Sequence, residues 1–348
     1  MSTGHAFRLL LLAIIVVILI VSSAASARWD ITLFTEAGYN SNPAMLTAEE
    51  RAAFEGGDPD YLRLDSDDDA LYRLGFEADY TWRPGELRME AGVYYRYTGY
   101  AYNAEKSYHF LKPRLEVSGG KWRAEAAYAF MPEYATRIYA DADETGSADF
   151  WASYEMRRGE LELRYNLTGN HWLCSAGELE YNRYNDHFPE YDGLSYKFGP
   201  VWRWFGPVYI KLGYAFRVYD ARGYDEEGET PESSEETDIS YQEDRIELYL
   251  SRDFRAAGKK LYAGLSGDFS ARYYASEKSF QIDYIHSGRR DLRLDLEPFL
   301  LILMSDRLNL RLGYGITLRD ADSPYYDLSP IKDYHRSMLW ARMEYEIR

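Results

Sequence analysis

The sequence predicts an all-β fold: a transmembrane, antiparallel up-and-down β-barrel of about fourteen strands. Apolar and polar residues alternate along segments that return roughly every twenty residues up to the C-terminus, and an export signal precedes them. Between Tyr72 and Trp82, for example, every second residue is apolar or aromatic. A period of two places the two sets on opposite faces of a strand, as a barrel with a lipid-facing outside and a polar inside requires.

Residues 1–27 have the features of a cleavable signal peptide. Arg8 is followed by thirteen apolar residues, from Leu9 to Val21, and then by Ala25-Ser26-Ala27. A helix of that length spans roughly 20 Å, which is too short for a hydrocarbon core of roughly 30 Å. We therefore expect cleavage after Ala27 and a barrel domain over residues 28–348. No later segment is long and apolar enough to be a transmembrane helix.

The composition suits this fold. The mean hydropathy is −0.50, as expected when only alternate residues face lipid. The chain contains 34 Tyr and 8 Trp, residue types that gather at membrane interfaces, although a tyrosine-rich soluble β-protein is an alternative. The net charge of −17 argues against nucleic acid as a partner. Cys174 is the only cysteine, so an intrachain disulfide is excluded and we expect a packing residue.

The first seven strands are expected where apolar residues recur at every second position between turn residues. A long acidic loop at 40–69 separates the first two strands, and Pro84-Gly85 and Gly119-Gly120 form tight turns. Residues 132–148 are expected to be a loop. The segment 150–168 is treated as a single crossing, because two strands there would break the even strand count. The expected ranges are 29–39, 72–82, 87–97, 111–117, 122–130, 150–168 and 173–181.

The other seven strands follow the same pattern. A loop at 186–193 leads into the eighth strand, Phe205-Gly206-Pro207 turns the chain into the ninth, and a second acidic loop covers 220–238. Further turns lie at 255–259 and 304–307. The expected ranges are 194–204, 208–218, 246–250, 261–273, 292–302, 308–318 and 339–347. Because short turns alternate with long loops, both termini are expected on the periplasmic side.

The polar half of the alternation is expected to face the lumen, because a charge on the lipid face costs roughly 2–4 kcal/mol at the midplane. The lumen is then mixed in sign, with a surplus of Arg and Lys. It is either a water-filled pore that favours anionic or sugar-like solutes, or it is partly filled by a network of ion pairs. The acidic members are Glu77, Asp79, Glu90, Glu125, Asp268 and Asp295. The pore-lining candidates are Arg73, Arg88, Arg96, Arg123, Lys197, Arg203, Lys211, Arg217, Arg272, Arg293, Arg311, Arg319 and Arg342.

The loops carry the opposite charge. Residues 225–238 hold eight acidic residues and no basic one, and the first loop contains Asp65, Asp67, Asp68 and Asp69. Clustered carboxylates bind Ca²⁺ or Mg²⁺ through oxygen, but the twelve-residue calcium loop is absent. We therefore expect solvated acidic loops, with any divalent-cation bridge to lipopolysaccharide being weak.

Motifs of enzymes, cofactors and metal sites are missing. The chain has six histidines; of these, His109, His187 and His335 lie near loops, where they either meet across the barrel mouth or are solvated. There is no G-x-S-x-G, no P-loop, no dinucleotide fingerprint and no metal-ligand spacing. We expect no catalytic site, no cofactor and no metal, with a barrel lipase or protease as the remaining enzymatic alternative.

Two segments resemble a known group. Ala37-Gly38-Tyr39-Asn40-Ser41-Asn42-Pro43 resembles the G-Y-[DN]-S-N segment that opens many proteobacterial outer-membrane barrel domains. The segment 319–323, followed by Tyr334 and the closing strand, resembles the end of the same domains, with departures at Pro324 and Arg348. The group includes the barrels of surface lipoprotein assembly modifiers and of exopolysaccharide-export porins. The resemblance implies the fold more than either activity.

These observations predict a single barrel in the outer membrane of a Gram-negative bacterium that passes or exports a hydrophilic solute. The alternatives are a non-conducting barrel for surface-protein or lipoprotein assembly or binding, and a barrel hydrolase. The expected partners are outer-membrane lipid and lipopolysaccharide, the barrel-assembly machinery and periplasmic export partners.

Overall fold

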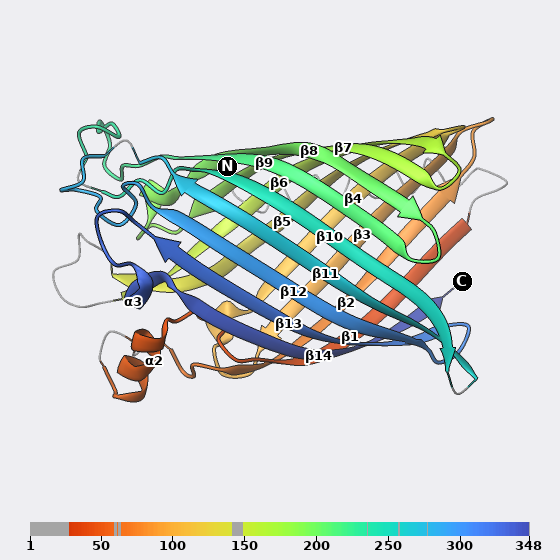
Figure 1. Ribbon diagram of the computed structural model, residues 1–348, viewed down its shortest axis with the longest axis horizontal. Coiled ribbons are helices and arrows are strands. Elements are labelled where there is room, and N and C mark those ends of the chain that lie inside the picture. The colour runs from red at the N-terminus through yellow and green to blue at the C-terminus, as the bar shows by residue number, and fades with distance from the viewer. Residues whose placement is uncertain are drawn as a thin grey trace.

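The chain forms one closed antiparallel barrel of fourteen strands, which confirms the predicted fold class. The computed structural model describes residues 28–347 except 59–60, 62–63, 141–148, 235, 257 and 277. Each strand pairs with its neighbours in sequence, and β1 closes the barrel by pairing with β14 (Figure 1). The expected signal peptide, residues 1–27, lies outside the described residues.

The strands follow one another around the barrel in the order of the chain. They are β1 (Arg28–Asn40), β2 (Asp69–Trp82), β3 (Arg88–Tyr100), β4 (Tyr108–Gly119), β5 (Trp122–Ala140), β6 (Asp149–Thr168), β7 (His171–Tyr184), β8 (Gly193–Phe205), β9 (Tyr209–Ala221), β10 (Tyr241–Ala256), β11 (Lys259–Tyr274), β12 (Arg290–Leu303), β13 (Leu308–Asp322) and β14 (Tyr334–Ile347).

The expected loop at 132–148 is wrong in its first half, because β5 continues to Ala140. Its pairing with β6 shifts register between Met131 and Tyr134 and again between Ala135 and Arg137. Each irregularity interrupts the two-residue period on which the sequence argument depended. The segment 150–168 is a single strand, as the parity argument predicted. Strand β10 begins five residues earlier than expected, because strand ends beyond the lipid need no apolar face.

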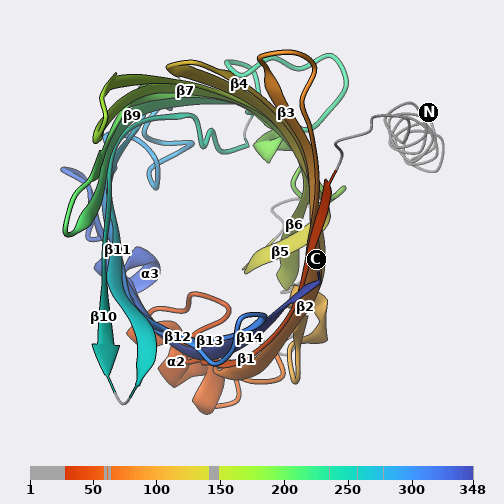
Figure 2. The same ribbon diagram turned by 90° about the vertical axis from the view of Figure 1, so that its right-hand side faces the viewer.

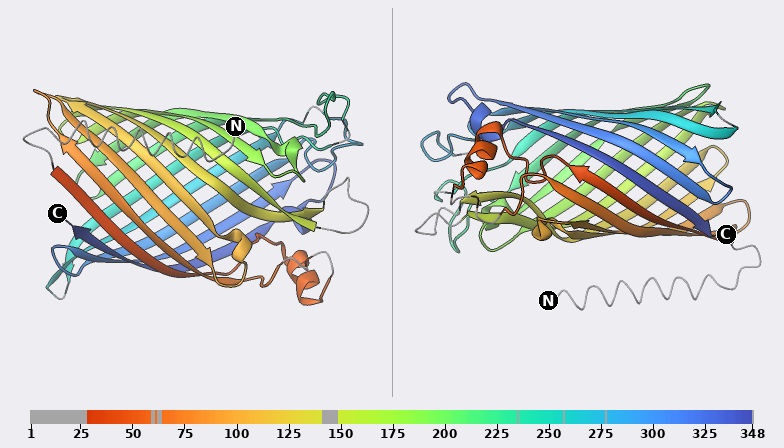
Figure 3. Two further views of the ribbon diagram at one scale, coloured as in Figure 1. Left: turned by 180° about the vertical axis from the view of Figure 1, so that it is seen from behind. Right: turned by 90° about the horizontal axis from the view of Figure 1, so that it is seen from below.

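The long loops gather at one end of the barrel and the short turns at the other, where both termini of the barrel also lie (Figure 3). The long-loop end carries the helices α2 (Ala48–Glu55) and α3 (Ser329–Lys332) and the 3₁₀ turns η2 (Ala104–Lys106) and η3 (Pro189–Tyr191). Helix α2 begins with a capping box: the Thr47 hydroxyl accepts the N–H of Glu50, and the Glu50 carboxylate accepts the N–H of Thr47.

The segment that resembles the start of proteobacterial barrel domains has a structural role at the seam between β1 and β14. Asn42 is buried; its amide donates to the carbonyl oxygens of Leu46 (2.8 Å) and His335 (3.1 Å), and its side-chain oxygen accepts the N–H of Leu46 (2.8 Å). The Ser41 hydroxyl accepts the N–H of Ser337 at 2.9 Å. These bonds hold the first long loop against the last strand where the barrel closes.

The outward face is an apolar belt between two rings of aromatic residues. Exposed leucines such as Leu161, Leu163 and Leu179 occupy the middle of the strands. Exposed aromatic side chains lie near the strand ends: Tyr39, Tyr181, Tyr196 and Tyr273 toward the long loops, and Trp29, Trp122 and Phe254 toward the short turns. An apolar exterior of this kind on a closed barrel is typical of a membrane-spanning protein. No helix of the described residues is long and apolar enough to cross a bilayer.

Candidate functional site: the inward face of the barrel

Strand register places the predicted pore-lining residues on the inward face. Across neighbouring strands, directly opposed residues share a face, and the pairs include Lys197 with Arg217, Arg203 with Lys211, Arg293 with Arg319, and Arg311 with Arg342. The other candidates, Arg73, Arg88, Arg96, Arg123 and Arg272, alternate with outward apolar residues in the same way. Four opposed pairs of like charge repel unless carboxylates lie nearby.

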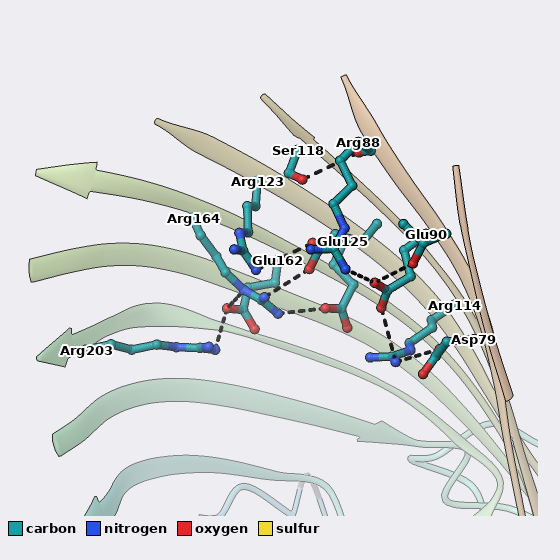
Figure 4. A network of polar contacts seen from close by, with 12 residues as sticks. Asp79, Arg88, Glu90, Arg114, Ser118, Arg123, Glu125, Glu162, Arg164 and Arg203 are labelled. Atoms are coloured by element: carbon teal, nitrogen blue, oxygen red, sulfur yellow. Dashed lines mark hydrogen bonds and ion pairs between the residues drawn. The ribbon is translucent and has the colours of Figure 1, made fainter. Parts of the chain in front are cut away.

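Carboxylates supply that compensation over much of the wall. Arg164 on β6 lies 3.2 Å from Glu116, 2.6 Å from Glu125 and 2.5 Å from Glu162, and Glu162 also pairs with Arg203 at 2.6 Å (Figure 4). Nearer to β2, Arg114 lies 3.0 Å from Glu77, 2.7 Å from Asp79 and 3.5 Å from Glu90. Lys197 and Arg217 share Glu178. Networks of this kind hold side chains in defined positions more effectively than isolated pairs do.

Many of these charged residues were absent from the sequence-based set. Arg164 and Glu162 alternate with the outward Leu161, Leu163 and Tyr165, so the period of two contained the signal. The other inward charges that were missed include Glu36, Lys112, Arg114, Glu116, Arg158, Glu160, Glu178, Glu180, Glu243, Arg245, Glu247, Asp291, Glu297, Arg336 and Glu344. The missed carboxylates neutralise most inward cations, so the surplus of positive charge is local and not a property of the whole lumen.

The inward ion pairs run along the wall. Among the described strands, every ion pair joins residues of one strand or of strands at most two places apart around the barrel. Several members remain open to solvent, with side-chain exposures of 40% for Glu77, 32% for Arg245 and 42% for Arg293. A lumen crossed by ion pairs would bury these groups, so the arrangement favours a solvated interior over a filled one.

Three inward arginines have no carboxylate partner among the described residues. Arg96 donates to the Tyr108 hydroxyl at 3.1 Å, and Arg336 donates to the Thr317 hydroxyl at 3.1 Å. The Arg311 guanidinium lies 4.2 Å from the centre of the Phe299 ring. Within the described part of the chain, the buried Nε atoms of Arg96 and Arg311 have no hydrogen-bond acceptor. A hollow of about 200 Å³ lies next to this region, lined among others by Asp268, Asp295, Thr317 and Arg336.

At the long-loop end, α2 and α3 contact the end of β5, which points into the mouth of the barrel from the other side (Figure 2). The Arg137 guanidinium pairs with the Glu50 carboxylate on α2 and donates to the carbonyl of Ile331 on α3 at 3.1 Å. The Thr47 hydroxyl donates to the carbonyl of Pro330 at 2.6 Å. Beneath them Leu46, Leu64, Ile138 and Trp151 form a small apolar cluster. The first and last long loops are therefore fixed to each other and to the end of β5.

Lys106 and Asp283 are two of the buried titratable groups in the loops outside the membrane-spanning strands. Lys106 in η2 is 1% exposed and donates to the carbonyls of Ala135 (2.8 Å) and Thr136 (2.7 Å). Burial, together with the charge of Arg336, lowers the pKa of Lys106 to about 7. Burial opposes the charge of Asp283, but the hydrogen bond from His286 at 2.8 Å, with others from Ser276 and the Asp238 N–H, outweighs it and lowers the pKa of Asp283.

The first acidic loop differs in part from the solvated segment that was expected, whereas Glu226, Glu227 and Glu232 of the second acidic loop are exposed, as expected. Asp69 is fully buried, and its carboxylate accepts the N–H groups of Ala101 (2.9 Å), Tyr102 (3.1 Å) and Asn103 (2.8 Å), so it holds the loop between β3 and β4. Asp67 pairs with Arg51. In the second acidic loop Glu235 lies outside the described residues. The described part of the chain contains no group of three or more His, Cys, Asp or Glu side chains arranged to hold a metal.

A cluster of histidines across the mouth is contradicted by the structure. His109 pairs in register with the outward Tyr97, and its Nδ1 lies 2.9 Å from the Tyr95 hydroxyl on the outer surface. His335 pairs in register with Leu318, another outward residue. His187 stacks on Phe150. The alternation of faces along β4 and β14 turns His109 and His335 away from the lumen, so the three histidines cannot share a site. Cys174 is buried, as predicted for a packing residue.

The solved structures to which this chain is similar include barrels of the outer membrane. No protein-family model and no curated protein matches the chain. Among solved structures it is similar to a bacterial polysaccharide outer membrane secretin, with 11% identity and a TM-score of 0.46 over 91% of this chain and 98% of that chain. In-vitro folded OmpT, an outer membrane protein of Vibrio cholerae, has 12% identity and a TM-score of 0.44, over 93% of this chain and 100% of that chain. An anion-selective porin from Comamonas acidovorans has 8% identity and a TM-score of 0.43, over 92% of this chain and 99% of that chain.

Scores of this size carry no inference about activity. The closed topology and apolar exterior of the chain itself group it, at the level of fold, with outer-membrane β-barrels, as the resemblance of its two segments implied.

Proposed function

We propose that this protein is a channel of the bacterial outer membrane that passes small hydrophilic solutes, with a preference for anions. The observation that carries the channel is the course of the inward ion pairs, and the anion preference rests on Arg96, Arg311 and Arg336, which have no carboxylate partner among the described residues. The ion pairs run along the wall between strands at most two places apart and leave charged groups in contact with solvent. A lumen lined by fixed charges and filled with water lets hydrophilic solutes through, and its charge pattern sets their selectivity.

The outer membrane is the proposed location because closed barrels with an apolar belt and aromatic girdles belong to that membrane. The long loops then face the exterior and the short turns and termini face the periplasm. The proposed partners are outer-membrane lipid, lipopolysaccharide around the apolar belt, and the barrel-assembly machinery. An export role would add periplasmic partners at the short-turn end.

Conductance across a planar lipid bilayer tests the proposal. The folded barrel should give discrete current steps, and a KCl gradient should give a reversal potential displaced toward that of chloride. An ion-tight barrel at both polarities would contradict a channel and favour the alternative, a non-conducting barrel for assembly or binding of surface proteins. A reversal potential displaced toward that of potassium would contradict the anion preference alone.

A further inference from the structure

Glycines and aromatic rings alternate across one part of the inward wall. In register from β11 to β1 lie Gly264, Phe299, Gly313, Trp340 and Gly38. A Cβ built on Gly264 would clash with the Phe299 ring, and one built on Gly313 would clash with the Trp340 ring. The missing side chains therefore let the rings lie flat on the neighbouring strands, where Phe299 and Trp340 are buried.

Arginines lie on these flat rings. The Arg311 guanidinium is 4.2 Å from the centre of the Phe299 ring and 5.5 Å from that of Trp340. The Arg342 guanidinium is 4.8 Å from the centre of the Phe34 ring, which in turn covers Gly75. The rings attract the guanidinium groups by cation–π interaction. The layers, from the wall inward, are glycine backbone, aromatic ring and guanidinium.

These residues belong to a strip that crosses five strands. Arg311 on β13 opposes Arg342 on β14, Arg342 opposes Glu36 on β1, and Glu36 opposes Arg73 on β2. Thr98 on β3 opposes Arg73, and Arg96 lies two residues before Thr98 on the same face, opposite Gly75. We call Arg311, Arg342, Arg73 and Arg96 the arginine strip; at roughly 4.8 Å per strand it is about 19 Å wide.

The strip is short of negative charge. Glu36 is its buried carboxylate; it pairs with Arg73 and accepts from Arg342 at 2.8 Å. Arg342 also lies 3.7 Å from Glu344, whereas Arg311 and Arg96 have no carboxylate partner in the described chain. Arg164 on β6, outside the strip, has three carboxylates within 3.2 Å. Guanidinium groups without carboxylate partners form a site prepared for an anion.

We propose that the arginine strip binds the carboxylate group of organic anions that pass through the lumen. Guanidinium forks match the two oxygens of a carboxylate, and the opposed Arg311 and Arg342 offer two forks side by side. The inference deepens the proposed function, because it names the chemical class of the solute and the residues that recognise it. Binding itself does not require that the barrel conducts.

The test uses D-glucuronate and D-glucose, two sugars of the same ring that differ in a carboxylate. Equilibrium dialysis against the folded, detergent-solubilised barrel measures binding without conductance. D-Glucuronate should bind and D-glucose should not. Arg311→Gln should lower the affinity for D-glucuronate about tenfold, which is the effect of losing one charge-assisted hydrogen bond. Arg311→Lys keeps the charge but loses the fork and should also weaken it. Folding of each variant is checked by its heat-dependent migration on a gel.

Arg245→Gln is the matched control, because it removes the same charge from the lumen at a residue that pairs with Asp268 at 2.6 Å. It should leave D-glucuronate affinity within about twofold, since an exposed paired charge contributes little. Equal losses of D-glucuronate affinity in Arg311→Gln and Arg245→Gln would show that the total charge of the lumen, and not the arginine strip, binds the anion. Equal binding of the two sugars by the unmodified barrel would overturn recognition of the carboxylate, and so would failure of both sugars to bind. An ion-tight barrel that binds D-glucuronate would contradict only the channel.

Discussion

The indole ring of Trp340 on β14 lies against the backbone of Gly313, the residue opposite it on β13. A methyl group at Gly313 would overlap the ring, so the position of the tryptophan depends on the absence of a side chain on the neighbouring strand. Arg311, two residues before Gly313 on the same face, places its guanidinium 5.5 Å from the centre of that ring. One glycine therefore sets the position of a buried ring and supports a lumenal arginine.

Gly313→Ala should destabilise the barrel by about 1–3 kcal/mol, the usual cost of overpacking a tight contact. The matched control is Gly315→Ala on the same face of β13, where a Cβ would meet its nearest atom, Met338 Cβ, at an ordinary 3.8 Å. Urea-dependent unfolding of the barrel measures both changes. Similar losses of unfolding free energy in the two variants would show that the fit of Trp340 against Gly313 does not matter.

Glu36→Gln should destabilise the barrel on the order of 3 kcal/mol, because it leaves Arg73 and Arg342 partly buried without the carboxylate they share. Glu344→Gln removes the same charge from a looser and more exposed pair with Arg342, 3.7 Å long, and should cost less than about 1 kcal/mol. The unfolding free energies of the two variants in the same lipid decide the matter. A Glu36→Gln barrel as stable as Glu344→Gln would mean that the lumen solvates these arginines freely.

Leu161→Arg should destabilise the barrel by about 2–4 kcal/mol, because it places a charge on the lipid face near the middle of β6. Leu167→Arg, on the same face but one residue from the end of the strand, should cost only about 0–1 kcal/mol. Folding into vesicles at graded urea concentrations compares the two. Equal costs at both positions would contradict the depth assigned to β6 in the bilayer.

The stability of the barrel should rise with pH between about pH 7 and pH 10 through Lys106. Burial lowers the pKa of Lys106 to about 7 in the folded state, whereas an unfolded lysine keeps a pKa near 10.5. Within this window the unfolded chain binds more protons than the folded chain, so raising the pH favours folding. Unfolding free energies at pH 7, 8.5 and 10 should show the rise, and Lys106→Met should show less of it. An identical pH dependence in this variant would mean that Lys106 stays protonated.

The amino-acid sequence by itself determined the architecture. An alternation of two residues is a property of each strand alone, and it identified the lipid face, the lumenal face and the strand count without knowledge of neighbours. It failed at Met131–Arg137, where bulges break the period. It also left many inward charges unassigned, although Arg164 and Glu162 stand at the correct parity between outward leucines.

Only the tertiary structure decided which inward residues meet. Glu36 and Arg342 are far apart in the chain and come into contact because β1 closes on β14. The rows that place rings on glycines and arginines on rings depend on the register of each strand pair. A shift by two residues would preserve every face and change every neighbour. Faces follow from local geometry, whereas partners across the wall follow from register, which the whole closed barrel sets.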